Sequence, residues 1–142
     1  MKPVSHLLEG RESTLWHARP DDTVFQALHL LAEHEAGALM VMDQGRLVGI
    51  LSERDYTRKI ALQGRSSKDT LVKEIMTREV LYVTPRTRTR ECMALMAEKK
   101  IRHLPVIDGD TVVGMISVRD ILDDIIADHE ETIAQLENYI RS

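Results

Sequence analysis

The sequence predicts an α+β fold built from two copies of one β-α-β-β-α unit, and three observations support this. The chain matches itself without a gap when it is shifted by 65 positions. Each half carries the same order of extended, helical and hairpin patterns. Each half also ends its hairpin with a Gly-x-x-Ser-x-Arg-Asp motif. Matched positions include Pro20 with Pro85, Leu30 with Leu95, Ser52 with Ser117 and Asp55 with Asp120.

The first extended runs of the two halves are Leu15–Ala18 and Val80–Thr84, each ending at or just before a proline that disfavours helix in the preceding residue. Asp22 and Thr87 are the predicted N-caps of the following helices. In the first half, that helix has one apolar face, formed by Val24, Ala27, Leu28, Leu31 and Ala32.

A hairpin follows the helix in each half. In the first half its strands are Ala38–Met42 and Leu47–Leu51, and in the second they are Leu104–Ile107 and Val112–Ile116. Gly64–Ser67 interrupts the pattern as a linker. We therefore expect one repeat over 14–66, a second over 75–127 and a helical extension over 128–142. Because one unit buries little apolar surface alone, the copies should pack sheet to sheet about a pseudo-twofold axis, with two related clefts between them.

Composition excludes several classes of protein. Hydrophobic residues make up 43% and charged residues 30% of the chain, which is typical of a folded globular protein. The net charge of −4 offers no basic field for a nucleic-acid backbone, so no nucleic-acid partner is expected. No apolar run reaches the ~20 residues that cross a bilayer, and Met1–Gly10 lacks a signal-peptide pattern. We expect a cytoplasmic protein without a membrane partner.

The motif Gly49–Asp55, repeated as Gly114–Asp120, has two interpretations. Ser-x-x-Asp at a helix start is a capping box, in which the serine oxygen accepts a backbone N–H. The same helix start can also seat a phosphate, with serine and arginine as donors and the aspartate accepting the hydroxyls of a ribose. The glycine would then let a ligand approach the strand closely.

These motifs, with Ile101–Asp108, Lys73–Thr77 and Val83–Pro85, resemble a tandem pair of cystathionine-β-synthase (CBS) domains, the Bateman module. The resemblance runs from about Thr14 to about Ile126. It implies binding of AMP, ADP, ATP, S-adenosylmethionine or NAD(H) in the clefts between the repeats.

The resemblance also implies which residues bind. The ribose-binding aspartates map onto Asp55 and Asp120, and the phosphate-side hydroxyls onto Ser52 and Ser117. Arg54 and Arg119, two residues after these serines, are the arginines that the helix-start interpretation adds as phosphate donors. The adenine slots map onto Ala38, Leu39 and Met40, and onto His103, Leu104 and Pro105. The family's pre-proline threonine maps onto Thr84, whereas the first copy has Arg19 there, so the two clefts need not be occupied equally.

The copies also differ in charge. Arg86, Arg88 and Arg90 align with Asp21, Thr23 and Phe25. These arginines form either a solvated helix face or a more cationic cleft that prefers a longer phosphate chain.

No catalytic or metal-binding constellation is evident. His29 and His34 are spaced too far apart for one helical face, and no paired Cys/His spacing exists. Cys92 and the methionines Met40, Met93, Met96 and Met115 are expected in the core. We expect no enzyme activity and no catalytic cofactor.

The C-terminal segment has a heptad-like apolar seam, interrupted by His129. Its members are Leu122, Ile126, His129, Ile133, Leu136 and Ile140. A final helix lying on its own domain would account for it. A helix that extends beyond the repeat and pairs with another subunit accounts for it better, so a homodimer is expected.

The leading hypothesis is a stand-alone regulatory module that binds an adenine nucleotide and signals energy or redox state to a protein partner. The alternatives are a regulatory subunit acting on an enzyme in trans and a structural dimer with empty clefts.

Overall fold

The computed structural model describes residues 2–10 and 16–141, and the chain divides into two compact units. The first unit comprises residues 13–81. The second unit comprises residues 82–142 together with residues 1–12, so the start of the chain belongs to the same unit as its end. Both units mix helices with a small sheet, which confirms the predicted α+β class.

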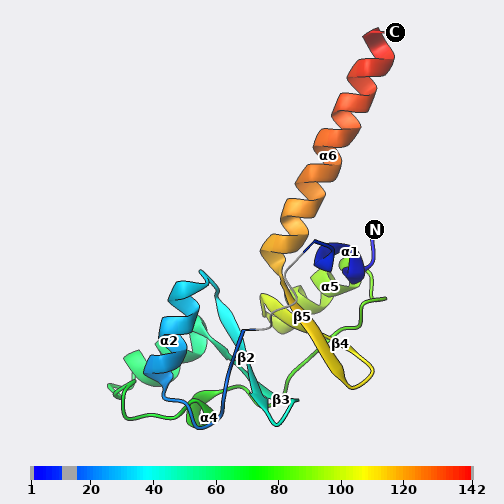
Figure 1. The fold of residues 1–142 in the computed structure, drawn as a ribbon. Helices are drawn as coiled ribbons and strands as arrows, with labels where there is room; N and C mark the ends of the chain where they lie inside the picture. The colour runs from blue at the N-terminus through cyan, green and yellow to red at the C-terminus, as the bar shows by residue number, and fades with distance from the viewer. Residues whose placement is uncertain (1, 11–15, 142) are drawn as a thin grey trace. The chain divides into compact units, whose positions relative to one another are not determined.

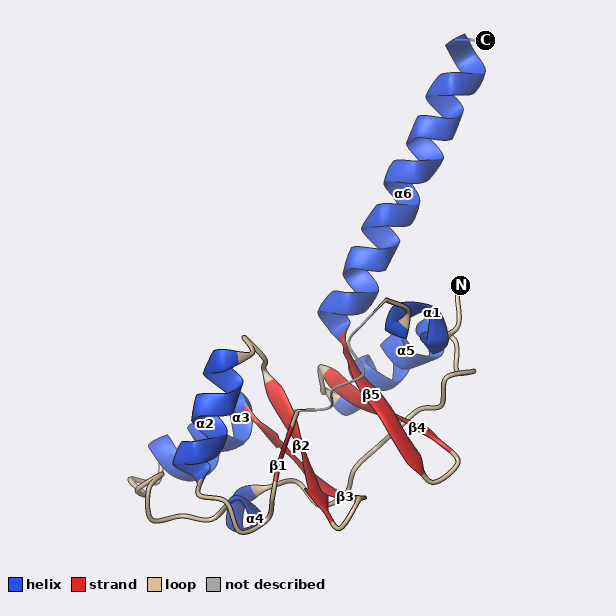
Figure 2. Ribbon diagram, in the orientation of Figure 1, coloured by secondary structure: helices blue, strands red, loops and turns tan. Residues whose placement is uncertain are grey.

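The first unit has a three-stranded sheet in the order β1-β2-β3, covered by helices (Figures 1 and 2). β1 runs parallel to β2, and β2 runs antiparallel to β3. Its elements are β1 (His17–Ala18), α2 (Val24–Glu33), β2 (Ala38–Asp43), β3 (Arg46–Ser52), α3 (Glu53–Tyr56), the π-helical turn η1 (Thr57–Ala61) and α4 (Val72–Ile75). The predicted strand from Leu15 begins outside the described residues, and only His17–Ala18 is paired.

The second unit has a two-stranded antiparallel sheet, β4-β5. Its elements are α1 (Val4–Leu8), α5 (Thr89–Lys99), β4 (His103–Asp108), β5 (Thr111–Ser117) and α6 (Val118–Arg141). The predicted strand Val80–Thr84 is wrong, because only Val83 makes a bridge, to Val106. Leu81 and Tyr82 are exposed, so the residues before Val83 lack the buried face that would hold them against β4.

Both predicted hairpins are confirmed, and each turn is closed by a glycine with positive φ. Gln44 and Gly45 have φ of 52° and 79°, the pattern of a type I′ turn, which matches the twist of the flanking strands. In the second hairpin Gly109 has φ of 62°.

The predicted N-caps are wrong by one residue. Thr23 caps α2 in a capping box with Gln26, and Arg88 precedes α5 without a side-chain cap. Asp22 and Thr87 instead close the turns that contain Pro20 and Pro85, here called the proline turns. The Asp22 carboxylate accepts the Arg19 N–H at 2.8 Å, and the Thr87 hydroxyl accepts the Thr84 N–H at 3.0 Å. Because the side chains are used inside the turn, the helix begins one residue later.

One feature that the sequence comparison missed is that α1 and α4 are equivalent. The Val72 N–H donates to the Asp22 carbonyl at 2.8 Å, and the Val4 N–H donates to the Thr87 carbonyl, also at 2.8 Å. The isolated bridges Thr23–Leu71 and Arg88–Pro3 match in the same way. Each unit is therefore completed by a short helix that caps its sheet.

Each unit has its own apolar core. Leu39, Val41 and Leu51 lie in the first, and Leu104, Val106 and Ile116 in the second. Cys92 is fully buried in the second core, as predicted, and burial raises the pKa of its thiol to about 11. Met40 and Met96 are buried, and Met93 and Met115 are half-buried.

The C-terminal helix α6 extends well beyond the rest of the second unit (Figure 1). Its side chains from His129 to Arg141 are exposed, so the interpretation of a helix lying on its own domain is wrong. No helix among the described residues is both long and apolar enough to cross a bilayer.

Candidate functional site

The motif at the end of the first hairpin forms a closed capping box at the start of α3. The Ser52 N–H donates to Asp55 Oδ2 at 2.9 Å, and the Ser52 Oγ accepts the Asp55 N–H at 3.2 Å. The Ser52 hydroxyl also donates to Asp55 Oδ2, at 3.1 Å. The capping interpretation is thus confirmed here, and serine and aspartate hold each other in place at the helix start.

Asp55 is 8% exposed, and its second oxygen is also engaged. Asp55 Oδ1 lies 3.3 Å from the Thr77 hydroxyl, which donates to it, and 3.1 Å from Lys59 Nζ. Lys59 Nζ also donates to the carbonyl of Ile75, at the end of α4. The carboxylate is therefore paired with one cation and several neutral donors, an arrangement that compensates for its burial.

The second motif repeats the box at the start of α6. The Ser117 N–H donates to Asp120 Oδ2 at 2.8 Å, and the Ser117 Oγ accepts the Asp120 N–H at 3.2 Å. Asp120 is half-buried. Arg54 and Arg119, which precede the two aspartates, are exposed on the first turn of their helices. Each unit thus presents a serine, an arginine and an aspartate at one helix start.

The glycines of the motif do not serve the role expected of them. A Cβ at Gly49 would lie 2.6 Å from Met76 Sδ and 3.0 Å from the Thr77 carbonyl oxygen. A Cβ at Gly114 would lie 3.1 Å from Leu8 Cδ2. The space beside Gly49 is filled by Met76 and Thr77, which follow α4, and the space beside Gly114 by Leu8, the last residue of α1. The interpretation of a ligand packed on these glycines is therefore wrong.

Pairing along the strands separates the predicted adenine-slot residues into two faces. Leu39 and Leu104 point into the cores of their units. Side chains alternate between the faces of a strand, so Ala38 and Met40, and likewise His103 and Pro105, lie on the other face. On that face, Ala38 pairs with Ser52 and His103 pairs with Ser117, next to the two capping boxes.

The pre-proline positions lie at the other end of these strands. Arg19 follows Ala18, which pairs with Val41, whereas Ser52 pairs with Ala38. Thr84 follows Val83, which bridges Val106, whereas Ser117 pairs with His103. At about 3.3 Å per residue, the difference in register places Arg19 and Thr84 roughly 10 Å or more along the strand from the capping box of their own unit.

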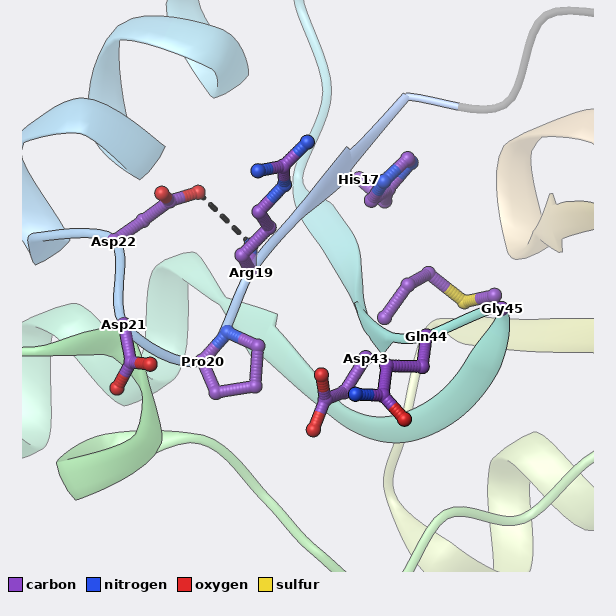
Figure 3. Close-up of a pocket in the computed structure, with 9 residues that line it drawn as sticks. His17, Arg19, Pro20, Asp21, Asp22, Asp43, Gln44 and Gly45 are labelled. Atoms are coloured by element: carbon purple, nitrogen blue, oxygen red, sulfur yellow. Dashed lines mark hydrogen bonds between the residues drawn. The ribbon is translucent and has the colours of Figure 1, made fainter.

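Arg19 borders a hollow of about 700 Å³ between the proline turn and the tip of the first hairpin (Figure 3). Asp21, Asp22 and Asp43 line it together with Arg19. Since carboxylates outnumber the guanidinium, this hollow is a poor seat for a phosphate.

The surroundings of the two boxes differ in charge, in a way that sequence reasoning missed. At the position equivalent to Lys59, the second unit has Asp124, whose carboxylate lies 3.2 Å from His6 Nε2 and 3.7 Å from Lys2 Nζ. A hydrogen bond between Lys2 and Asp128 raises the pKa of the lysine and lowers that of the aspartate. The signal was available in the repeat alignment, where Lys59 aligns with Asp124.

The remaining sequence candidates do not gather into a further site. Arg86 lies 3.7 Å from Asp108 in an exposed ion pair, as expected for a solvated surface. Among residues 2–10 and 16–141, no three His, Cys, Asp or Glu side chains are grouped as metal ligands.

The model of the family "CBS domain" matches residues 13–62 and 72–127. The chain is 43% identical over 134 residues to the CBS domain-containing protein CBSX3 of Arabidopsis thaliana, a mitochondrial protein, covering 91% of this chain and 65% of that protein. It is 34% identical over 102 residues to the CBS domain-containing protein YhcV of Bacillus subtilis, covering 72% of each chain. Cytoplasmic localisation therefore stays a prediction.

Among solved structures, a CBS-domain protein from Burkholderia ambifaria superposes with a TM-score of 0.86 at 46% identity, covering 89% of this chain and 96% of that chain. The fold and the tandem arrangement predicted from the sequence are thereby confirmed.

Proposed function

Because the chain belongs to the CBS domain family, we propose that it is a regulatory module that binds an adenosine-containing ligand at the Ser-x-Arg-Asp turns that begin α3 and α6. The ligand class comprises AMP, ADP, ATP, NAD(H) and S-adenosylmethionine. Binding would change how the module engages a protein partner and so report energy or redox state.

The observation that carries the proposal is that one polar constellation is built twice at equivalent helix starts. In each unit a serine hydroxyl, an exposed arginine and an aspartate meet within one turn. A helix N-terminus favours an anion, arginine pairs with phosphate, and a carboxylate accepts ribose hydroxyls. A capping box alone requires neither the arginine nor its repetition.

The strand faces beside the two turns suit the base of the ligand. Ala38, Met40 and Pro105 are buried although they do not belong to the core of their own unit, and they would form the apolar wall of the site beside His103. Apolar walls with a few fixed polar groups are the usual composition of a small-molecule site. Arg19 and Thr84 lie farther along the sheet. They could contact only a part of the ligand that is remote from the capping box of their own unit.

A solved structure with the same fold supports the ligand class. The CBS domain pair of the protein MJ0100, 24% identical to this chain, was crystallised with 5′-methylthioadenosine and S-adenosyl-L-methionine. Those ligands belong to that protein, and they show that the fold accommodates an adenosine moiety.

Calorimetric titration with AMP, ATP, NADH and S-adenosylmethionine tests the proposal. We expect at least one ligand to bind, and Asp55→Asn or Asp120→Asn to weaken its binding about tenfold or more, because a neutral amide replaces the acceptor of the ribose hydroxyls. Asparagine keeps a side-chain oxygen that can accept the serine N–H of the capping box, so the fold should persist.

The matched controls are Glu53→Gln in the first turn of α3 and Asp123→Asn in α6. Both carboxylates are exposed and neither belongs to a capping box, so both variants should bind like the wild type. Failure of all four ligands to bind, or equal weakening by the controls, would refute the assignment and favour the structural dimer.

A further inference from the structure

A row of exposed apolar side chains follows one side of α6. Leu122, Ile126, Ile133, Leu136 and Ile140 have 47%, 55%, 54%, 58% and 81% of their surface exposed. Together with His129, these side chains recur at alternating spacings of four and three, so they form one stripe along a helix of 24 residues. An apolar stripe of this length on a helix that leaves its own unit requires a partner.

The second unit uses a different side of α6 for its own packing. Ile121 is fully buried, Asp124 accepts from His6, and Asp128 accepts from Lys2 at 2.7 Å. In heptad notation with Ile126 at a, these three residues occupy positions c and f, which lie opposite the a/d stripe. Contacts with His6 of α1 and with Lys2, which precedes α1, therefore hold this side of the helix and leave the stripe uncovered.

From this arrangement we infer that α6 pairs with the α6 of a second copy as a parallel, in-register, two-stranded coiled coil. The a positions are Ile126, Ile133 and Ile140, and the d positions are Leu122, His129 and Leu136. Isoleucine at a with leucine at d is the combination that favours two parallel strands. A second copy is the only partner certain to offer a stripe with the same spacing.

The charges beside the stripe select the parallel orientation. The e positions are all acidic: Asp123, Glu130 and Glu137. The g positions, Ile125, Thr132 and Tyr139, carry no charge. In a parallel pair each e position faces a g position of the partner, so no acidic pair forms. In an antiparallel pair e faces e, which would place like charges side by side.

His129 is the single polar member of the stripe and lies near the middle of α6. In a parallel, in-register pair the two His129 rings meet at one d layer. A polar residue in such a layer lowers stability and fixes the register. His129→Leu should therefore tighten the dimer about tenfold.

Sedimentation equilibrium of the full chain tests the pairing. The wild type should be a dimer, and Ile133→Glu should raise its dissociation constant about 100-fold or more, because two unpaired carboxylates would be buried. The matched control is Ala134→Glu, at an exposed b position one residue away, which should leave the dimer intact. Circular dichroism should show both variants folded, since both positions are exposed.

Disulfide trapping tests the orientation. Ile140→Cys should cross-link two copies under mild oxidation, because position 140 meets itself only when the helices are parallel. Ala134→Cys points away from the partner and should remain uncross-linked, and the native Cys92 is buried.

A monomeric wild type, or a dimer unaffected by Ile133→Glu, would overturn the pairing. A dimer that is sensitive to Ile133→Glu, but whose Ile140→Cys variant fails to cross-link, would overturn the parallel orientation. Neither result depends on nucleotide, so this inference stands or falls separately from the proposed ligand.

Discussion

The two units share a set of connections but differ in where the chain supplies the last helix. In the first unit α4 comes after the sheet, and in the second α1 comes before it, at the other end of the chain. The backbone contacts of the two helices nevertheless match, among them Val24 N–H to the Thr70 carbonyl at 2.8 Å and Thr89 N–H to the Lys2 carbonyl at 3.0 Å. The comparison teaches that each unit needs a short helix against its sheet, whichever side of the sequence provides it.

The units differ most in the charges that hold this helix. In the first unit Lys59 joins the buried Asp55 to the end of α4. In the second unit the signs of charge are reversed, because the carboxylate of Asp124 on α6 pairs with His6 and Lys2 of the N-terminal segment. The side chain that receives the short helix is thus cationic in the first unit and acidic in the second.

The largest effect is expected from truncating the buried valine of either short helix. Val4 and Val72 are both fully buried. Val4→Ala and Val72→Ala should each lower the free energy of unfolding by about 2–3 kcal/mol, from lost apolar burial and the cavity left behind. Urea unfolding gives the magnitude, and hydrogen exchange should locate the loss in the second and first unit respectively. A Val4→Ala variant as stable as the wild type would refute the equivalence of α1 and α4.

Alanine substitutions of the motif glycines should destabilise the two units to different extents. Gly49→Ala would bring a methyl group against Met76 and the Thr77 carbonyl, which pairs with the Ile50 N–H at 3.0 Å, so the backbone itself must move. We expect Gly49→Ala to lower the free energy of unfolding by about 1–3 kcal/mol. Gly114→Ala meets only the flexible end of Leu8 and should cost less than about 1 kcal/mol. Thermal unfolding of the two variants compares them directly, and equal losses would contradict the difference in packing.

Periodicity and turn chemistry were sufficient to predict the hairpins and the two capping boxes. Both depend on residues close in sequence, such as Gly45 in its turn and Ser52 with Asp55. The cap of α2 was misplaced because Asp22 and Thr23 are both good caps, and only the turn geometry commits Asp22 to Arg19. Thr23 with Gln26 three residues later was the available signal.

The equivalence of α1 and α4 was missed because it depends on a different shift. Val4 to Leu8 aligns with Val72 to Met76 only when three more residues are allowed between helix and repeat, so the gapless comparison passed over it. The role of Gly49 was missed because Met76 is close to it in space and distant in sequence. The capping boxes were predictable, whereas the residues around them, Thr77 and Lys59, depend on tertiary packing.

The smallest effect concerns Cys92, whose counterpart in the first unit is Ala27. Burial raises the pKa of the folded thiol from about 9.0 to about 11, so between these values the unfolded chain loses a proton that the folded chain keeps. The thiol's contribution to stability is therefore complete below pH 9 and is lost as the pH rises towards 11, by about 1 kcal/mol at pH 10. Cys92→Ala, which installs the residue of the first unit, provides the control because all other groups titrate alike. Urea unfolding at pH 8 and pH 10 should show a larger decrease in stability for the wild type than for Cys92→Ala, and equal decreases would show that the thiol ionises as easily in the folded core as in the unfolded chain.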